Sequence, residues 1–222
     1  MTNWCKGTAA SGQNILTRPA GREDHEDQSA SSLVAFERAR PQSVLRRRGL
    51  GAHNAGSARD DQAQVGATAI VYKGPQVELV LSYRFAKQNP TGNWLMLDTV
   101  MTAATAPLEL PRTAISVRTP NGDVVPLATQ QSFGKAYPEL AASIARANAF
   151  LEPMGYLLPH RPRRMDYFSE PGRHLAFASV WLDEWHNTYG RLYFQLPEGV
   201  QKGNYELLVN LPQSQVTISF AI

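Results

Sequence analysis

The sequence has only one cysteine, Cys5, among its 222 residues. One cysteine cannot form an internal disulfide, and it also excludes zinc sites that are built from several cysteines. The fold must therefore rest on its hydrophobic core. A chain without disulfides is compatible with the cytoplasm and with a bacterial envelope protein that needs no cross-links.

Long apolar runs are also missing. No stretch approaches the roughly 18 consecutive apolar residues that a membrane helix needs, so the sequence predicts no transmembrane segment. Residues 1–6, MTNWCK, lead into polar and small residues and show no secretory pattern. A periplasmic or cell-envelope location is our expectation, although the sequence as written carries no signal peptide.

An excess of one charge is absent as well, because 22 Lys and Arg residues stand against 19 Asp and Glu, a net charge of +3. Nucleic-acid-binding domains gather positive charge on one face, and here it is scattered, so nucleic acid is not the expected partner. The chain has no Gly-x-Ser-x-Gly nucleophile motif and no glycine-rich phosphate loop. We therefore predict a protein that is not an enzyme and needs no cofactor.

The composition changes near residue 65. Residues 1–64 are rich in Ala, Ser, Gly, Arg, Asp and Gln and poor in large apolar side chains. Such a segment cannot bury enough apolar surface to offset the entropy that it loses on ordering. We predict a largely disordered tail over residues 1–64 and a single folded domain over residues 65–222.

The second part of the chain alternates apolar and polar residues in short runs, which is typical of β-strands. In residues 76–85, QVELVLSYRF, every odd position is apolar, so one face of this strand is expected to be buried. Residues 120–123, PNGD, suit a tight hairpin turn between two strands. Further strands are predicted at residues 65–72, 94–101, 113–118, 124–128, 174–183, 191–196, 205–211 and 215–222. Eight or nine short strands at this spacing predict a mostly β fold, an antiparallel sandwich or barrel.

Residues 137–151 follow a helical period instead. Leu140, Ile144, Ala147 and Leu151 fall on one face of a helix. Pro138 suits the first turn of that helix, where its missing N–H costs nothing. The sequence predicts one short helix inserted among the strands.

Two stretches near the C-terminus, LYFQLPEG at residues 192–199 and GNYELLV at residues 203–209, combine an apolar strand that ends in proline with a Gly-x-Tyr-x-Leu-x-Val strand. This pattern resembles the closing hairpin of immunoglobulin-like and macroglobulin-like sandwich domains. The resemblance implies an immunoglobulin-like β-sandwich and a structural role for Tyr205, whose hydroxyl would bond to the backbone. It implies no catalytic residues.

The richest cluster of chemistry-bearing side chains is WLDEWH at residues 181–186, with His174 upstream. His174, Glu184 and His186 combine imidazole and carboxylate groups, which suit zinc or a similar ion. Their spacing matches no helical zinc motif. The alternative is the polar start of a loop.

The aromatic residues support a second hypothesis. Flat rings at Trp94, Trp185 and Tyr189, together with Trp181 and Tyr193, could stack on a sugar or another small ligand. The alternative is that these rings are part of the core. The alternation in residues 174–183 places Leu175, Phe177 and Trp181 on one face, and we predict that this face points inward.

Residues 159–166, PHRPRRMD, hold Arg161, Arg163 and Arg164 in one compact stretch with two prolines. We predict a basic loop that binds an anionic partner surface, with pairing to nearby acidic residues as the alternative. The leading hypothesis is a non-enzymatic module that docks on a protein partner, as an accessory subunit of a bacterial envelope complex or another multi-subunit complex. A carbohydrate- or small-ligand-binding sandwich is the first alternative, and a metal-dependent enzyme using His174, Glu184 and His186 is the second.

Overall fold

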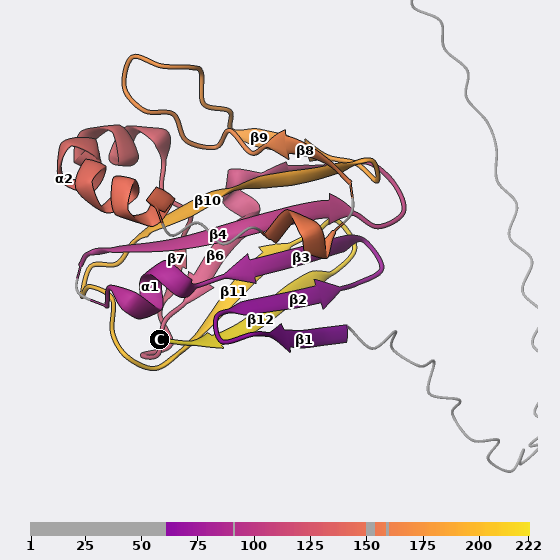
Figure 1. Cartoon of the computed structure of the whole chain (residues 1–222), viewed down its shortest axis with the longest axis horizontal. Helices are drawn as coiled ribbons and strands as arrows, with labels where there is room; N and C mark the ends of the chain where they lie inside the picture. Colours follow the sequence, from indigo (N-terminus) through magenta and orange to yellow (C-terminus); the bar gives the residue numbers. More distant parts are fainter. Residues whose placement is uncertain (1–60, 91, 150–153, 159) are drawn as a thin grey trace, which may run out of the picture. The chain divides into compact units, whose positions relative to one another are not determined.

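The computed structural model describes residues 61–90, 92–149, 154–158 and 160–222. The predicted disordered tail lies almost entirely outside these described residues. Within them the chain is mostly β, with a six-stranded, a four-stranded and a two-stranded sheet and few helices, as the alternation predicted (Figure 1). The first strand begins at Asp61, so the predicted boundary at residues 64 and 65 falls inside a strand.

The six-stranded sheet forms one layer. In spatial order its strands are β1 (Asp61–Val65), β2 (Ala69–Lys73), β3 (Val77–Ser82), β4 (Trp94–Ala103), β10 (His186–Gln195) and β8 (Arg161–Arg164). All neighbours are antiparallel except β8, which runs parallel to β10. The stretch that was predicted as a basic loop is therefore an edge strand.

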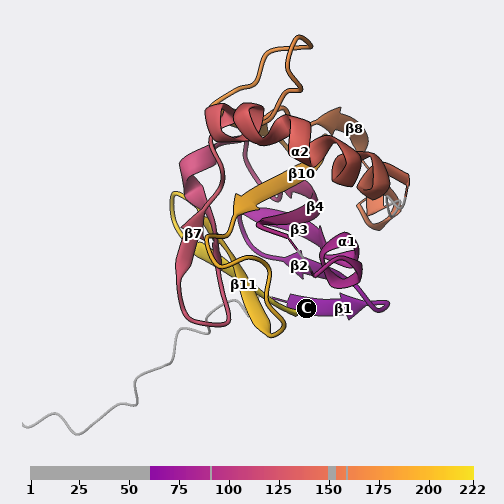
Figure 2. The same cartoon turned by 90° about the vertical axis from the view of Figure 1, so that its left-hand side faces the viewer.

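The four-stranded sheet forms the second layer, and Figures 1 and 2 show it against one face of the larger sheet. Its strands in spatial order are β12 (Gln215–Ala221), β11 (Asn204–Asn210), β6 (Ile115–Arg118) and β7 (Val124–Pro126). The predicted turn after Arg118 is confirmed: Gly122 has a φ of 93°, and the Thr119 N–H donates to the Asp123 carbonyl at 2.9 Å. A separate ribbon pairs β5 (Leu108–Pro111) with β9 (Ser179–Leu182).

Both faces of the large sheet are covered at strand β3. Leu79 and Leu81 of β3 belong to the main core between the sheets, whereas Val80 belongs to a second cluster that includes Met154 and Leu158. Strand β3 was predicted to be buried on one face only, and that prediction is wrong. The reason is that the segment after the long helix packs over the second face.

The described residues also form two α-helices, α1 (Arg84–Gln88) and the long α2 (Gln130–Ala149). Two short 3-10 helices are η1 (Arg112–Ala114) and η2 (Met154–Leu157). Helix α2 begins seven residues before the predicted start, because the Thr129 hydroxyl caps it by accepting the Ser132 N–H at 3.0 Å. Pro138 therefore lies inside the helix, where the missing N–H leaves the Gly134 carbonyl without its usual partner.

The predicted apolar face of α2 is confirmed for Leu140, Ile144 and Ala147, which are buried. Leu151 lies outside the described residues. Figure 2 shows α2 beside strand β10 of the large sheet. No helix in the described part of the chain is long and apolar enough to cross a membrane.

The two strands that suggested a closing hairpin do not form one. Strand β10 belongs to the six-stranded sheet and β11 to the four-stranded sheet, so the loop between them crosses from one layer to the other. The predicted role of Tyr205 is nevertheless confirmed. Its hydroxyl donates to the Gln201 carbonyl and accepts the Gln201 N–H, both at 2.9 Å.

Candidate functional site

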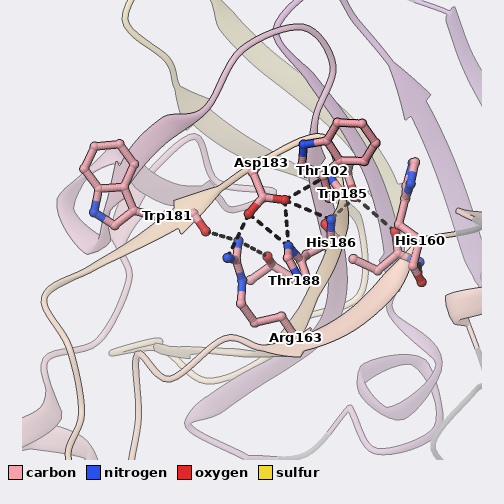
Figure 3. Close-up of polar contacts among 9 residues, drawn as sticks. Thr102, His160, Arg163, Trp181, Asp183, Trp185, His186 and Thr188 are labelled. Atoms are coloured by element: carbon pink, nitrogen blue, oxygen red, sulfur yellow. Dashed lines mark hydrogen bonds and ion pairs between the residues drawn. The ribbon is translucent and has the colours of Figure 1, made fainter.

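The turn between β9 and β10 is organised by one carboxylate, that of Asp183 (Figure 3). This carboxylate accepts the backbone N–H groups of Trp185 and His186, each at 2.9 Å, and contacts the His186 Nδ1 at 2.8 Å. Aspartate commonly bonds the backbone two or three residues further along the chain, which is what shapes a turn of this kind. The Asp183 side chain therefore sets where the Trp185 and His186 side chains project.

Arg163 completes the cluster from strand β8. Its Nη1 donates to Asp183 Oδ2 at 2.9 Å, and its Nη2 donates to the Trp181 carbonyl and, at 3.2 Å, to the Thr188 hydroxyl. Partial burial opposes the ionisation of Asp183. The hydrogen bonds from His186 and Trp185 and the charge of Arg163 outweigh it, so the pKa of Asp183 lies below its ordinary value of 3.8.

The three arginines of the predicted basic loop thus have different environments. Arg163 is half-buried in the cluster just described, whereas Arg161 and Arg164 are exposed. Arg164 forms an ion pair with Asp166 at 3.2 Å. Because β8 is a strand, neighbouring side chains project to opposite faces, and Arg163 and Arg164 cannot serve one common patch.

The residues proposed as metal ligands are engaged elsewhere. His174 Nε2 lies 3.4 Å from Asp166 Oδ1, and the His186 ring contacts Asp183. Among the residues that the structure describes, no three His, Cys, Asp or Glu side chains come together in a way that could hold a metal ion. The structure therefore does not bring His174, Glu184 and His186 into one site.

Three large apolar side chains that were predicted to enter the core are at the surface instead. Leu175 is 79% exposed, Phe177 53% and Trp181 60%. The predicted strand over residues 174–183 is reduced to β9, and the residues before it form a loop that stands away from the sheets (Figure 1). Leu175 and Phe177 lie outside β9, so the strand alternation that predicted their burial does not apply to them.

Hydrogen bonds from the rest of the domain fix the backbone of this exposed segment at Phe177 and Ala178. The Phe177 N–H donates to the Asp166 carbonyl at 2.8 Å, and Arg112 Nη2 donates to the Phe177 carbonyl at 2.8 Å. The Arg112 N–H also donates to the Ala178 carbonyl at 2.8 Å. The backbone that carries the exposed side chains is therefore fixed by the body of the domain.

The aromatic residues proposed for sugar stacking do not form one platform. Trp185 and Tyr189 are 68% and 44% exposed, but Trp94 is half-buried against the main core, and Tyr193 is buried. Figure 3 shows the rings of Trp181 and Trp185 on opposite sides of Asp183.

A cleft of about 570 Å³ lies between α2 and the outer face of the large sheet. Asp98 of β4 and Arg191 of β10 sit in its wall as a buried ion pair, with Nε and Oδ1 2.7 Å apart. Arg191 Nη1 also donates to Asn148 Oδ1 of α2 at 3.0 Å. Burial disfavours the charged guanidinium, but Asp98 outweighs that effect, so the pKa of Arg191 lies above its ordinary value.

Three aromatic rings also line the cleft, those of Phe133 on α2, Tyr193 on β10 and Phe168. Phe133 of α2 packs on Phe168 and Tyr193, with ring centroids 5.2 and 4.8 Å away. Burial raises the pKa of Tyr193, although the charge of Arg191 opposes the shift, so the phenol is protonated at neutral pH. Sequence reasoning missed this cleft. One signal was present, because Asp98 is the only charged residue of strand β4.

The cleft beside α2 and the exposed segment around Trp181 are two candidate binding places in the described part of the chain. Clefts of this size, with apolar walls and a few polar groups, are the usual form of small-molecule sites. Large exposed apolar side chains are the usual mark of protein-binding surfaces. Comparisons with protein-family models, with curated proteins and with solved structures found no match to this chain.

Proposed function

We propose that this chain is a non-enzymatic docking module that binds a protein partner through Leu175, Phe177 and Trp181, here called the apolar loop surface. The exposure of these three side chains, 53–79%, is the observation that carries the proposal. Large apolar side chains exposed on one segment are typical of a protein-binding surface, and tryptophan is enriched at the centre of such interfaces. Apolar side chains that stay in water contribute no burial free energy to the stability of the monomer.

The fixed backbone of the segment supports the same function. Arg112 holds the carbonyls of Phe177 and Ala178, and Asp166 accepts the Phe177 N–H. A surface that is already ordered loses less conformational entropy on binding, which improves affinity for a given contact area. The Arg163–Asp183 pair extends this support to the Trp181 carbonyl.

The charges around the surface favour a protein over an anionic membrane. Glu109 lies directly opposite Trp181 in the β5–β9 ribbon, and Arg173 is neutralised by Glu170 at 2.8 Å. A membrane-binding surface would surround its aromatic residues with unpaired basic groups. We propose a partner with an apolar contact patch, and the exposed Arg161 would meet carboxylates at its rim.

The architectural part of the proposal is an immunoglobulin-like sandwich that has an extra helix. Two sheets enclosing one core and the Tyr205 hydroxyl bonded to the backbone support it. The parallel edge strand β8 departs from that plan. Because such a fold hosts many unrelated functions, the docking role rests on the exposed side chains and not on the fold.

Photo-crosslinking in the source cells tests the docking function. A photoreactive amino acid replaces Trp181 in one full-length variant and Val124 in another, since Val124 of β7 is also exposed, at 53%. We expect one protein to be crosslinked at position 181 and not at position 124. The same protein should co-purify in stoichiometric amount with the unmodified chain.

The serine variants Phe177→Ser and Val124→Ser form a matched pair, because both positions are 53% exposed. We expect Phe177→Ser to reduce the recovered partner at least tenfold and Val124→Ser to leave it unchanged. Equal crosslinking at both positions, or equal recovery with both serine variants, would show that the apolar loop surface is not the docking site.

A further inference from the structure

We propose that the cleft between α2 and the large sheet binds an uncharged small molecule that presents hydroxyl or carbonyl oxygens beside an apolar ring face. This site is separate from the apolar loop surface, because none of Leu175, Phe177 and Trp181 lines the cleft. Its volume of about 570 Å³ falls within the range of small-molecule sites.

The charges in the wall argue against an ionic ligand. Two carboxylates, Asp98 and Glu170, and two guanidinium groups, Arg164 and Arg191, line the cleft, so their formal charges cancel. Each has a partner of opposite charge within the protein: Asp98 pairs with Arg191, Arg164 with Asp166 and Glu170 with Arg173. An ionic ligand would have to displace one of these partners, which leaves a protein charge unpaired, or lie in the cleft without a counter-charge. Either arrangement makes the binding free energy less favourable.

Neutral oxygens fit the polar groups of the wall. A guanidinium carries five N–H donors, more than Arg191 needs for its hydrogen bonds to Asp98, Asn148 and the Tyr193 hydroxyl. The protonated Tyr193 hydroxyl lies beside it in the same wall. A ligand hydroxyl or carbonyl can accept from these donors without disturbing the Asp98–Arg191 pair.

The remaining wall is apolar and suits the face of a ring. Val100, Ile144 and Met154 contribute aliphatic surface, and the buried ring of Phe168 adds an aromatic wall. Tyr189, 44% exposed, also lines the cleft and is free to pack over a bound ring. Sugar rings and phenolic rings share this chemistry, with oxygens at the edge and an apolar face.

Methyl-detected NMR of the full chain tests the proposal. The neutral probes are methyl β-D-glucopyranoside, methyl α-D-mannopyranoside and 4-methoxyphenol, and the ionic controls are 4-methoxybenzoate and 4-methoxybenzylammonium. We expect a neutral probe to shift the methyl signals of Ile144 and Met154 and to leave Ile218, in the core between the sheets, unchanged. The ionic controls should bind at least tenfold more weakly.

The responses of the separate probes identify the source of the ligand. Shifts with the glycosides alone assign the cleft to sugars, and shifts with 4-methoxyphenol alone assign it to phenolic compounds. Tighter binding of either ion than of every neutral probe would overturn the proposal. The absence of Ile144 and Met154 shifts with all three neutral probes would overturn it as well.

Two tyrosine variants locate the binding site. Tyr189→Ala removes a ring that lines the cleft and should weaken the neutral probe at least tenfold. Tyr156→Ala removes a more exposed ring, 69%, that does not line the cleft, and should change nothing. Equal affinity of the two variants for the probe would place its binding elsewhere on the protein.

Discussion

Arg191 and Asp98 face each other directly across strands β10 and β4 and form a buried ion pair of 2.7 Å. Their side chains are only 8% and 12% exposed. The guanidinium also reaches Asn148 of α2, so a single side chain links two strands and the long helix. This link positions the wall of the cleft, and its energetics give the first prediction.

Replacement of Arg191 by methionine should lower the free energy of unfolding by about 3–5 kcal/mol, because Asp98 keeps its buried charge and loses its counter-charge. Urea denaturation followed by tryptophan fluorescence measures the change. The double variant Asp98→Leu/Arg191→Met removes both charges and should recover much of the loss. A double variant no more stable than the single one would contradict this account.

The Asp183→Asn variant should change how stability depends on pH. The pKa of Asp183 is lowered in the folded protein, so its ionised form stabilises the fold above the ordinary value of 3.8, and this contribution is lost as the pH falls through the folded value. Wild-type stability should therefore fall more steeply below about pH 4 than that of Asp183→Asn. Thermal unfolding between pH 2 and pH 6 tests this, and parallel curves would refute it.

Arg163→Ala and Arg161→Ala form a matched pair in the edge strand β8. Arg163→Ala removes the hydrogen bonds to Asp183, Thr188 and the Trp181 carbonyl and should cost about 1–3 kcal/mol. Arg161 is exposed, so its removal should change stability by less than about 0.5 kcal/mol. Chemical denaturation compares the two, and equal losses would mean that Arg163 does not organise the turn.

Tyr205→Phe should destabilise the domain by about 1–3 kcal/mol, because the N–H and the carbonyl of Gln201 lose the hydroxyl to which they are bonded. The ring itself stays in place against Phe220, with a centroid distance of 5.5 Å. Denaturation with urea at neutral pH measures the effect. No measurable loss would show that water replaces the hydroxyl at no cost.

Two glycines should respond in opposite ways to alanine. A Cβ at Gly190 of β10 would lie 2.7 Å from Met165 Cβ, so Gly190→Ala should cost about 1–3 kcal/mol through overpacking. A Cβ at Gly134 of α2 would meet nothing within 4 Å, so Gly134→Ala should stabilise the helix by about 0.5–1 kcal/mol. Melting temperatures that move in the same direction would contradict the prediction.

Much of the fold was predictable because its signals are local. The alternation in residues 76–85 depends on the two-residue repeat of a strand, and the buried face of α2 depends on the helical repeat. The sequence predicts too late a start for α2 because Pro138 is typical of a first helical turn, whereas the helix begins after its cap at Thr129. Strand β8 was missed because two prolines and three arginines resemble a loop, and only pairing with β10 makes this segment a strand.

The candidate sites depended on contacts that no local pattern contains. Alternation predicted one buried strand face with Leu175, Phe177 and Trp181, but only Trp181 lies in a strand. Burial depends on what packs against a side chain, and all three are at the surface in the described part of the chain. Arg163 looked like its neighbours in sequence, and its burial follows from the position of Asp183 twenty residues away.

The sequence by itself determined that this protein is mostly β, that one amphipathic helix interrupts the strands, and that Tyr205 bonds to the backbone, because each of these follows from short-range periodicity or from a short motif. The tertiary structure alone decided that Arg191 pairs with Asp98, that a cleft lies beneath α2, and which apolar face meets water. These features join residues as much as 93 positions apart, and only the packing of complete sheets and helices brings such residues together.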